Sequence, residues 1–150
     1  MDNQELTTFL LKARTKTYAG NAGKTQAVLG GSVQFEYVEG DYLYRDIYYI
    51  GNRIFSGIEA IYFKGKPIWS MSYFGDFKKM TEKETDKVLR KALIENWKTT
   101  RLWSKVEAKY NEFQYICEGR GLIDEMYGTE KVIKNGDTLF FFYYAGGIIG

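Results

Sequence analysis

Two segments of the chain carry apolar residues at the three- and four-residue spacing of an α-helix. The first segment covers residues 3–18, and Asp2 with Glu5 offers a capping box ahead of it. The second covers residues 82–99, behind a capping box of Thr81 and Glu84. The apolar positions of the two predicted helices are Leu6, Phe9, Leu10 and Ala13, then Val88, Leu89, Ala92, Leu93 and Trp97.

Elsewhere the pattern changes to short runs of β-branched and aromatic residues separated by glycine, which indicates strands joined by turns. Turns are expected at Gly40-Asp41, Gly51-Asn52 and Gly65-Lys66, and residues 100–111 receive no predicted element. The expected strands cover residues 34–38, 42–50, 55–64, 68–74, 112–118, 125–134 and 138–145. This order predicts an α+β fold with a largely antiparallel sheet and two helices, packed on one face of the sheet or at its ends.

The order of helix, strands, helix and strands suggests internal repetition. Sliding the chain by 71 positions superimposes residues 55–75 on residues 126–146 without a gap. The identical pairs are Gly57 with Gly128, Glu59 with Glu130, Gly65 with Gly136, Tyr73 with Tyr144 and Gly75 with Gly146. We therefore predict a single domain over residues 1–150. It would consist of two tandem repeats, at about 3–76 and 81–148, related by a pseudo-twofold axis, with a groove between the halves.

Composition adds one unusual feature to this pattern. Hydrophobic residues make up 45% of the chain and charged residues 27%, as is usual for a globular protein, whereas aromatic residues reach 17%, with 13 Tyr and 10 Phe. Tyrosine has an apolar ring and a polar hydroxyl. A chain this rich in tyrosine is expected either to form strands whose faces are partly exposed to solvent or to use tyrosines to line a ligand cleft.

Charge and cysteine content indicate which partners and which cellular compartment to expect. The net charge is +2, with basic and acidic residues interspersed, so we expect no direct binding to nucleic acid. The single cysteine, Cys117, excludes an internal disulfide and is expected in the core. The polar start is unlike a signal peptide, and the longest apolar stretch, residues 139–150, is too short for a membrane span. We therefore expect a cytoplasmic protein without a membrane partner.

The chain contains no histidine, which excludes Ser-His-Asp and Cys-His nucleophiles and the usual zinc sites. The segment Gly20 to Thr25 resembles the end of a phosphate-binding loop. However, Tyr18 occupies the position of the loop's first glycine, so a helix C-cap and a loop are expected instead. We predict no catalytic residue, no metal and no cofactor.

Glu59 and Glu130 are the most informative polar positions. Alternation along a strand places Glu59 on the same face as Phe55 and Ile61, and Glu130 on the same face as Val132. If the repeats are related by a twofold axis, both carboxylates occupy equivalent places and can face a central groove. Three interpretations stay open: a structural carboxylate that receives hydrogen bonds from turn amides or tyrosines, a ligand site, and an acid/base pair as in sugar hydrolysis.

Asp46 shares a predicted strand face with Tyr42, Tyr44 and Tyr48. It is either the solvent edge of that face, which we favour, or part of a polar site. Among the aromatic residues that follow, Trp69, Tyr73 and Phe74 are expected in the core.

Three motifs follow one another along the chain: Tyr42-Leu-Tyr-Arg-Asp46, Phe55-Ser-Gly-Ile-Glu59 and Pro67-Ile-Trp-Ser-Met-Ser-Tyr-Phe-Gly75, with weaker echoes at Tyr127-Gly-Thr-Glu130 and Tyr143-Tyr-Ala-Gly-Gly147. With these motifs the chain resembles an uncharacterised bacterial domain family. Members of that family occur alone or fused behind the helix-turn-helix DNA-binding domain of transcription regulators. The resemblance implies a sensing or binding role and assigns no catalytic residue.

We therefore expect a small-molecule-binding module, either a sensor or a sequestering protein, for a planar, cationic or nucleotide-like ligand. The expected ligand-binding residues are Asp46, Glu59, Trp69 and Tyr73, with Glu130 and Tyr144 opposite. One alternative is a protein-interaction module or homodimer that pairs through an edge strand such as residues 139–144. A carboxylate-dependent hydrolase is a further alternative.

Overall fold

The structure, a computed structural model, describes residues 2–20, 22–98 and 105–150. The first half contains α1 (Asn3–Lys16), β1 (Lys24–Thr25), β2 (Val33–Glu39), β3 (Tyr42–Gly51), β4 (Ile54–Phe63) and β5 (Lys66–Asp76). The second half contains α2 (Glu82–Glu84), the π-helical segment η1 (Thr85–Arg90), α3 (Lys91–Glu95), β6 (Val106–Tyr110), β7 (Phe113–Leu122), β8 (Glu125–Lys134) and β9 (Asp137–Ile148).

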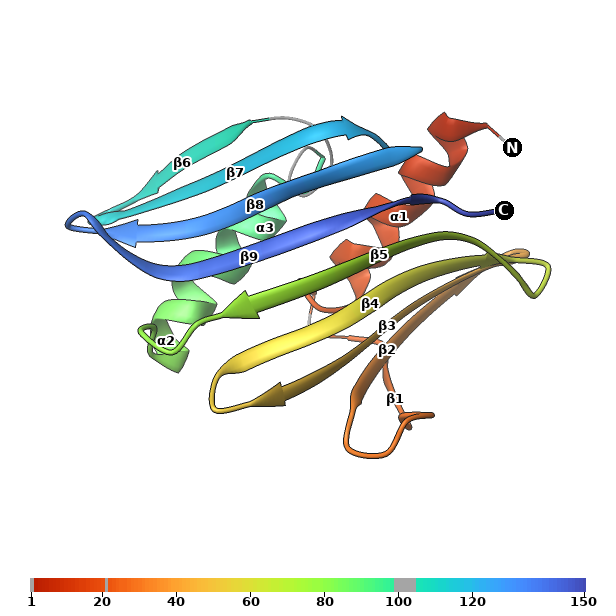
Figure 1. Ribbon diagram of the computed structural model, residues 1–150, viewed down its shortest axis with the longest axis horizontal. Helices are drawn as coiled ribbons and strands as arrows, with labels where there is room; N and C mark the ends of the chain where they lie inside the picture. Colours follow the sequence, from red (N-terminus) through yellow and green to blue (C-terminus); the bar gives the residue numbers. More distant parts are fainter. Residues whose placement is uncertain (1, 21, 99–104) are drawn as a thin grey trace.

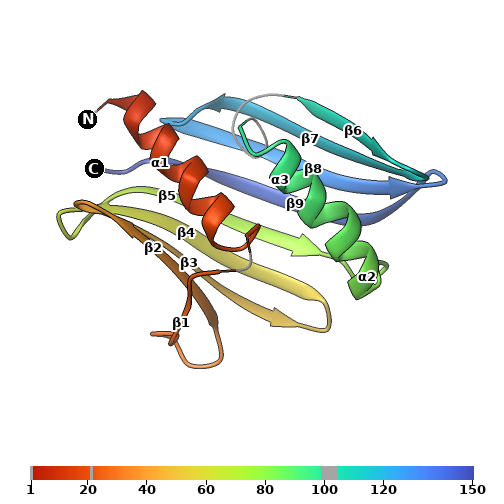
Figure 2. The same ribbon diagram turned by 180° about the vertical axis from the view of Figure 1, so that it is seen from behind.

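All the strands join one antiparallel sheet of nine strands in the order β1-β2-β3-β4-β5-β9-β8-β7-β6. The helices lie together on one face of this sheet, behind it in Figure 1 and in front of it in Figure 2. The predicted α+β class and the antiparallel sheet are therefore confirmed. Each half contributes a run of strands in chain order, and the two runs meet at the centre, where β5 pairs with β9.

The two halves pair their strands in the same register when residue numbers are shifted by 71. Asp46 lies opposite Glu59, and Cys117 lies opposite Glu130. The register shifts after Ile61 in the β4–β5 ladder and after Val132 in the β8–β9 ladder. At the centre of the sheet Tyr73 lies opposite Tyr144, so the two residues that the shift superimposes face each other across the junction of the halves.

Helix α1 begins where its sequence predicts, because the Asp2 side chain accepts a hydrogen bond of 2.9 Å from the backbone N–H of Gln4. The helix buries one face against the sheet. Its buried residues are Leu6, Phe9, Leu10, Leu11 and Ala13. The buried face belongs to one hydrophobic core that extends under both helices and includes Trp69 and Phe140.

The second helical region begins with the predicted capping box, in which Thr81 and Glu84 satisfy each other's backbone N–H groups. It then continues through η1 and α3, with Val88, Leu89, Ala92 and Leu93 buried. A π-helical turn inside a helix is frequent at functional sites. The predicted end of this helix, at residue 99, lies outside the described residues.

Four details differ from the sequence prediction. The segment after α1 forms the short strand β1, and residues 106–110 form β6, although neither strand was predicted. Phe74 points away from the helices and is 43% exposed, whereas Trp69 and Tyr73 are buried as expected. Residues 139–144 lie in β9, which pairs on both sides, so this stretch cannot act as an edge strand. Within the described ranges, no helix is long and apolar enough to cross a membrane.

Candidate functional site

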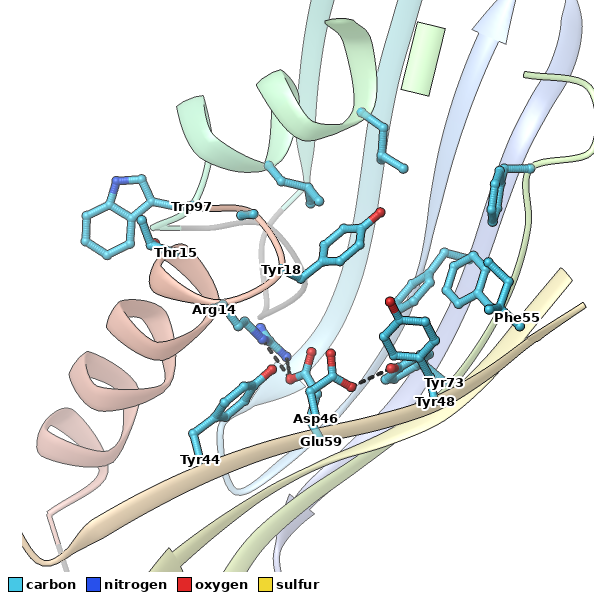
Figure 3. A pocket seen from close by; sticks show the side chains of 16 residues that line it. Arg14, Thr15, Tyr18, Tyr44, Asp46, Tyr48, Phe55, Glu59, Tyr73 and Trp97 are labelled. Atoms are coloured by element: carbon cyan, nitrogen blue, oxygen red, sulfur yellow. Dashed lines mark hydrogen bonds and ion pairs between the residues drawn. The ribbon is translucent and has the colours of Figure 1, made fainter. Parts of the chain in front are cut away.

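A cavity of about 90 Å³ lies between the helices and the strands of the first half (Figure 3). A water molecule needs roughly 10–15 Å³ of such space, so the cavity has room for several waters or for one ring-sized group. Both halves contribute to its walls. The lining residues are Arg14, Thr15, Tyr18, Ala19, Tyr44, Asp46, Tyr48, Ile50, Phe55, Glu59, Tyr73, Phe77, Leu89, Leu93, Trp97 and Phe142.

The alternation of side chains along β3 and β4 places two carboxylates side by side on the cavity floor. Tyr44, Asp46 and Tyr48 point from β3 toward the helices, and Glu59 lies directly opposite Asp46 on β4. Asp46 is 5% exposed and Glu59 is 3% exposed. Two like charges at directly opposed positions destabilise a sheet unless other groups compensate them.

Arg14 provides the compensation for Glu59. The Arg14 Nε donates a hydrogen bond of 2.8 Å to Glu59 Oε2, and Nη2 lies 2.7 Å from the same oxygen. The guanidinium also contacts the Met71 sulfur, at 3.3 Å, and lies 5.8 Å from the centre of the Trp69 ring. Because Arg14 stands in the last turn of α1, this ion pair ties the helix to the middle of the sheet.

Asp46 is held from the other side by Tyr73. The Tyr73 hydroxyl donates a hydrogen bond of 2.5 Å to Asp46 Oδ1 (Figure 3). Burial raises the pKa of Tyr73 well above its usual value, and the negative charge of Asp46 raises it further. The pKa of Tyr48 is raised to about 12, first by burial and then by the neighbouring Tyr18 and Asp46. Both phenols therefore stay neutral hydrogen-bond donors at physiological pH.

Aromatic rings form much of the rest of the wall. Phe55 and Phe77 lie 5.6 Å apart between ring centres, and Trp97 approaches from the end of the second helical region. Tyr18 is covered by Arg90 of η1, whose guanidinium carbon lies 4.8 Å from the ring centre. The cavity thus combines a charged floor with apolar and aromatic walls.

The structure brings three of the six predicted ligand residues to this cavity, namely Asp46, Glu59 and Tyr73. The burial of Asp46 shows that the favoured solvent-edge interpretation is wrong, because the helices cover that face of β3. Trp69 is fully buried beside Arg14, and its Nε1 donates a hydrogen bond of 3.0 Å to the Ile123 carbonyl.

Glu130 and Tyr144 do not line the cavity. Glu130 is completely buried in the second half and accepts a hydrogen bond of 2.7 Å from the Tyr115 hydroxyl. The Tyr144 hydroxyl is buried beside Cys117 without a hydrogen-bond partner of normal geometry among the described residues. The structure therefore does not bring Glu59 and Glu130 to the same cavity, as an acid/base pair acting on one bound sugar would require.

Sequence reasoning missed Arg14, although the pattern contains a signal for it. Arg14 follows Leu10 by four positions, so it lies on the buried face of α1. A charged residue on the apolar face of a helix indicates a buried partner. That this partner is Glu59 depends on how α1 lies across the sheet, and the spacing of residues along the helix does not determine that path.

Comparison with known protein families shows one match. Residues 46–149 match the family described as Domain of unknown function (DUF5680). The chain belongs to this family. No curated protein and no solved structure matched the chain. The predicted resemblance to a domain family of unknown function is thereby confirmed.

The DUF5680 match begins at Asp46 and includes Glu59 and Tyr73. Helix α1, with Arg14, precedes the matched region, so the cavity of this DUF5680 protein is completed by a segment outside it. Within the described part of the chain, no group of His, Cys, Asp or Glu is arranged to hold a metal ion. The chemistry that the cavity offers is hydrogen bonding, charge and aromatic contact.

Proposed function

We propose that this chain binds a small organic molecule in the cavity beneath its helices and acts as a sensor or a sequestering module. One observation carries the proposal. Three buried side chains, Asp46, Glu59 and Tyr73, meet the partly buried Arg14 at the floor of a cavity whose walls are otherwise largely apolar and aromatic. Ligand sites combine apolar walls with a few convergent polar groups in this way.

A contribution to folding stability does not by itself explain this cluster of polar side chains. A buried ion pair such as Arg14 with Glu59 contributes little net stability, because removing both charges from water costs about as much as their attraction returns. Well-packed apolar residues at the same places would stabilise the fold at least as well. A second buried carboxylate at Asp46, beside a cavity, therefore favours a role in recognition.

We further propose that the halves are tandem repeats related by a pseudo-twofold axis. The common register of the strand ladders at an offset of 71 residues supports this proposal. If the halves began alike, the first half has Asp46 beside the cavity at the place where the second half has Cys117.

The resemblance to domains fused behind helix-turn-helix regulators supports a sensing role, in which a DNA-binding partner responds to occupancy of the cavity. We propose a cytoplasmic location, with the single Cys117 buried and reduced. We propose no catalytic step.

A thermal-shift screen of small nucleotides, aromatic amines and sugars tests the proposal. A ligand present at a hundred times its dissociation constant should add about 2.7 kcal/mol of stability. Ala19 lies at the cavity wall, so Ala19→Trp should block the cavity and abolish the shift. Ala145→Trp makes the same change on the opposite face of the sheet and should leave the shift intact. A shift that survives Ala19→Trp contradicts the proposal.

A second candidate, protein interaction or homodimer formation, is favoured by the outer face of the sheet. This face carries exposed aromatic side chains close together, with Phe74 opposite Tyr143 and Phe141 next to both. Sedimentation over a range of concentrations tests it. Self-association through this face predicts a dimer that Tyr143→Lys dissociates, whereas a monomer at all concentrations excludes the homodimer.

A further inference from the structure

We propose that the ligand is a planar organic cation and that the Asp46 carboxylate recognises its positive charge. This inference rests on the proposed function and specifies the chemistry of the same cavity. It goes beyond the sequence expectation in one respect, because it assigns the recognition of charge to a single residue, Asp46.

The balance of charge in the cavity favours a cation. In the part of the chain that the structure describes, the charged side chains that line the cavity are two carboxylates, Asp46 and Glu59, and one guanidinium, Arg14. Arg14 directs both Nε and Nη2 to Glu59. The lining therefore carries a formal charge of −1 in a largely buried setting, where the attraction between opposite charges is stronger than in water.

The walls favour a flat ligand. Tyr48, Phe55 and Phe77 bring aromatic side chains to the cavity from two strands and the loop after β5. Aromatic faces attract cations and stack on planar groups. The cavity has room for a group of the size of one ring. A ring that carries an amine or amidine can thus contact the walls while its charged end reaches Asp46.

The second half of the chain shows that the hairpin does not need the acid in order to fold. At an offset of 71 residues, the place of Asp46 is taken by Cys117, which is buried and lies opposite Glu130 as Asp46 lies opposite Glu59. Close packing of a tyrosine hydroxyl on a glycine is the same in both halves. An added Cβ would lie 2.6 Å from the Tyr73 hydroxyl at Gly57, and 2.5 Å from the Tyr144 hydroxyl at Gly128.

The architecture therefore forms with a thiol at this position in one half and a carboxylate in the other. The carboxylate of Asp46 lines the cavity described above, and Cys117 does not line it. A charge that folding does not require, placed where a ligand fits, is best explained by recognition of that ligand. Burial is the largest cause of the raised pKa values of Tyr48 and Tyr73, and the negative charge of Asp46 adds to it, so a negative charge is disfavoured at these two hydroxyls.

Three ring compounds of nearly the same shape test the inference: benzamidine, a cation; benzamide, which is neutral; and benzoate, an anion. Each is titrated into the protein, and the dissociation constant is measured from NMR chemical shifts. The dissociation constant of benzamidine should be lower than that of benzamide by a factor of about ten or more, as expected for a charge-assisted hydrogen bond. Benzoate should bind most weakly.

The Asp46→Asn variant keeps an oxygen acceptor for Tyr73 but removes the charge, and should bind benzamidine and benzamide equally. Should this variant not fold, Asp46→Cys, which copies the second half, replaces it. The control is Asp41→Asn, which removes an exposed carboxylate and should preserve the preference.

The outcomes separate the two proposals. If benzamide or benzoate binds as tightly as benzamidine, or if the preference survives the loss of the Asp46 charge, the inference is wrong while the cavity remains a ligand site. If none of the three compounds moves the resonances of cavity residues, the inference is also wrong. The proposed function is then decided separately, by the thermal-shift screen and its Ala19→Trp comparison.

Discussion

The Tyr73 hydroxyl donates a hydrogen bond of 2.5 Å to the Oδ1 of Asp46, across the strand that carries Glu59. The contact fixes the carboxylate in a buried position next to the cavity. In the second half the corresponding tyrosine, Tyr144, has Cys117 as its neighbour. The two halves thus share a framework and differ in the chemistry that it presents.

This difference predicts unequal effects of removing the two hydroxyls. Tyr73→Phe deletes a hydrogen bond to a buried carboxylate and should reduce the free energy of unfolding by about 1.5–3 kcal/mol. Tyr144→Phe deletes a hydroxyl without a hydrogen bond of normal geometry among the described residues. Its effect should stay within about 0.5 kcal/mol, or stabilise the protein slightly. Urea unfolding of both variants provides the comparison, and equal losses would contradict the asymmetry.

Glu59→Gln should be much more destabilising than a similar change at a more exposed ion pair. It leaves the partly buried Arg14 without its carboxylate, which costs about 3 kcal/mol. The matched change, Glu36→Gln, affects the pair with Arg45, whose side chains are about a quarter exposed, and should cost about 1 kcal/mol or less.

A double variant identifies the cause of the loss at Glu59. Replacing Arg14 by Met together with Glu59 by Leu removes both charges of the ion pair and should cost less than Glu59→Gln alone, because neither member of the pair is left without its partner. Equilibrium unfolding measures all three variants. If Glu59→Gln is no worse than Glu36→Gln, then the ion pair does not anchor α1.

Gly57 is expected to tolerate no side chain. An alanine Cβ there would lie 2.5 Å from the Ile47 carbonyl oxygen and 2.6 Å from the Tyr73 hydroxyl. Gly57→Ala should therefore destabilise the protein by about 1–3 kcal/mol and displace Tyr73. Gly51, at the end of β3, has open space at the same place, so Gly51→Ala serves as the control and should change stability by less than about 0.5 kcal/mol. Similar melting temperatures for the two variants would contradict this packing.

The partly buried Tyr48 predicts a loss of stability in alkali. Burial raises the pKa of Tyr48 from the usual 10 to about 12, so the folded state keeps a proton that the unfolded state releases above pH 10. The resulting stabilisation is complete below pH 10 and is lost as the pH rises toward about 12. Urea unfolding across this range should show a falling free energy, with a smaller slope for Tyr48→Phe. An unchanged slope in that variant would exclude Tyr48 as a source.

Much of the fold could be predicted from local patterns. The caps at Asp2 and Thr81 fixed the starts of the helices, and the glycine turns separated the strands of each half. β6 was missed although Val106, Ala108 and Tyr110 alternate with charged residues, because the run is short and follows a stretch without a clear pattern.

The site could be predicted only in part. Alternation correctly put Asp46 and Glu59 on faces shared with aromatic residues, since that depends on a period of two along a single strand. The partner of Glu59 depends on the path of α1 over the sheet, and the separation of Glu130 from the cavity depends on which side chains fill each half. These are properties of packing between distant segments, and local periodicity does not encode them.

The most direct measurement locates a bound compound by intermolecular nuclear Overhauser effects between its ring protons and the methyl groups of the protein. Benzamidine, or the compound with the largest thermal shift, should show contacts to Leu89 and Leu93, which line the cavity. Contacts to Ile58 and Ala145, on the opposite face of the sheet, would place the ligand outside the cavity and contradict the proposed function.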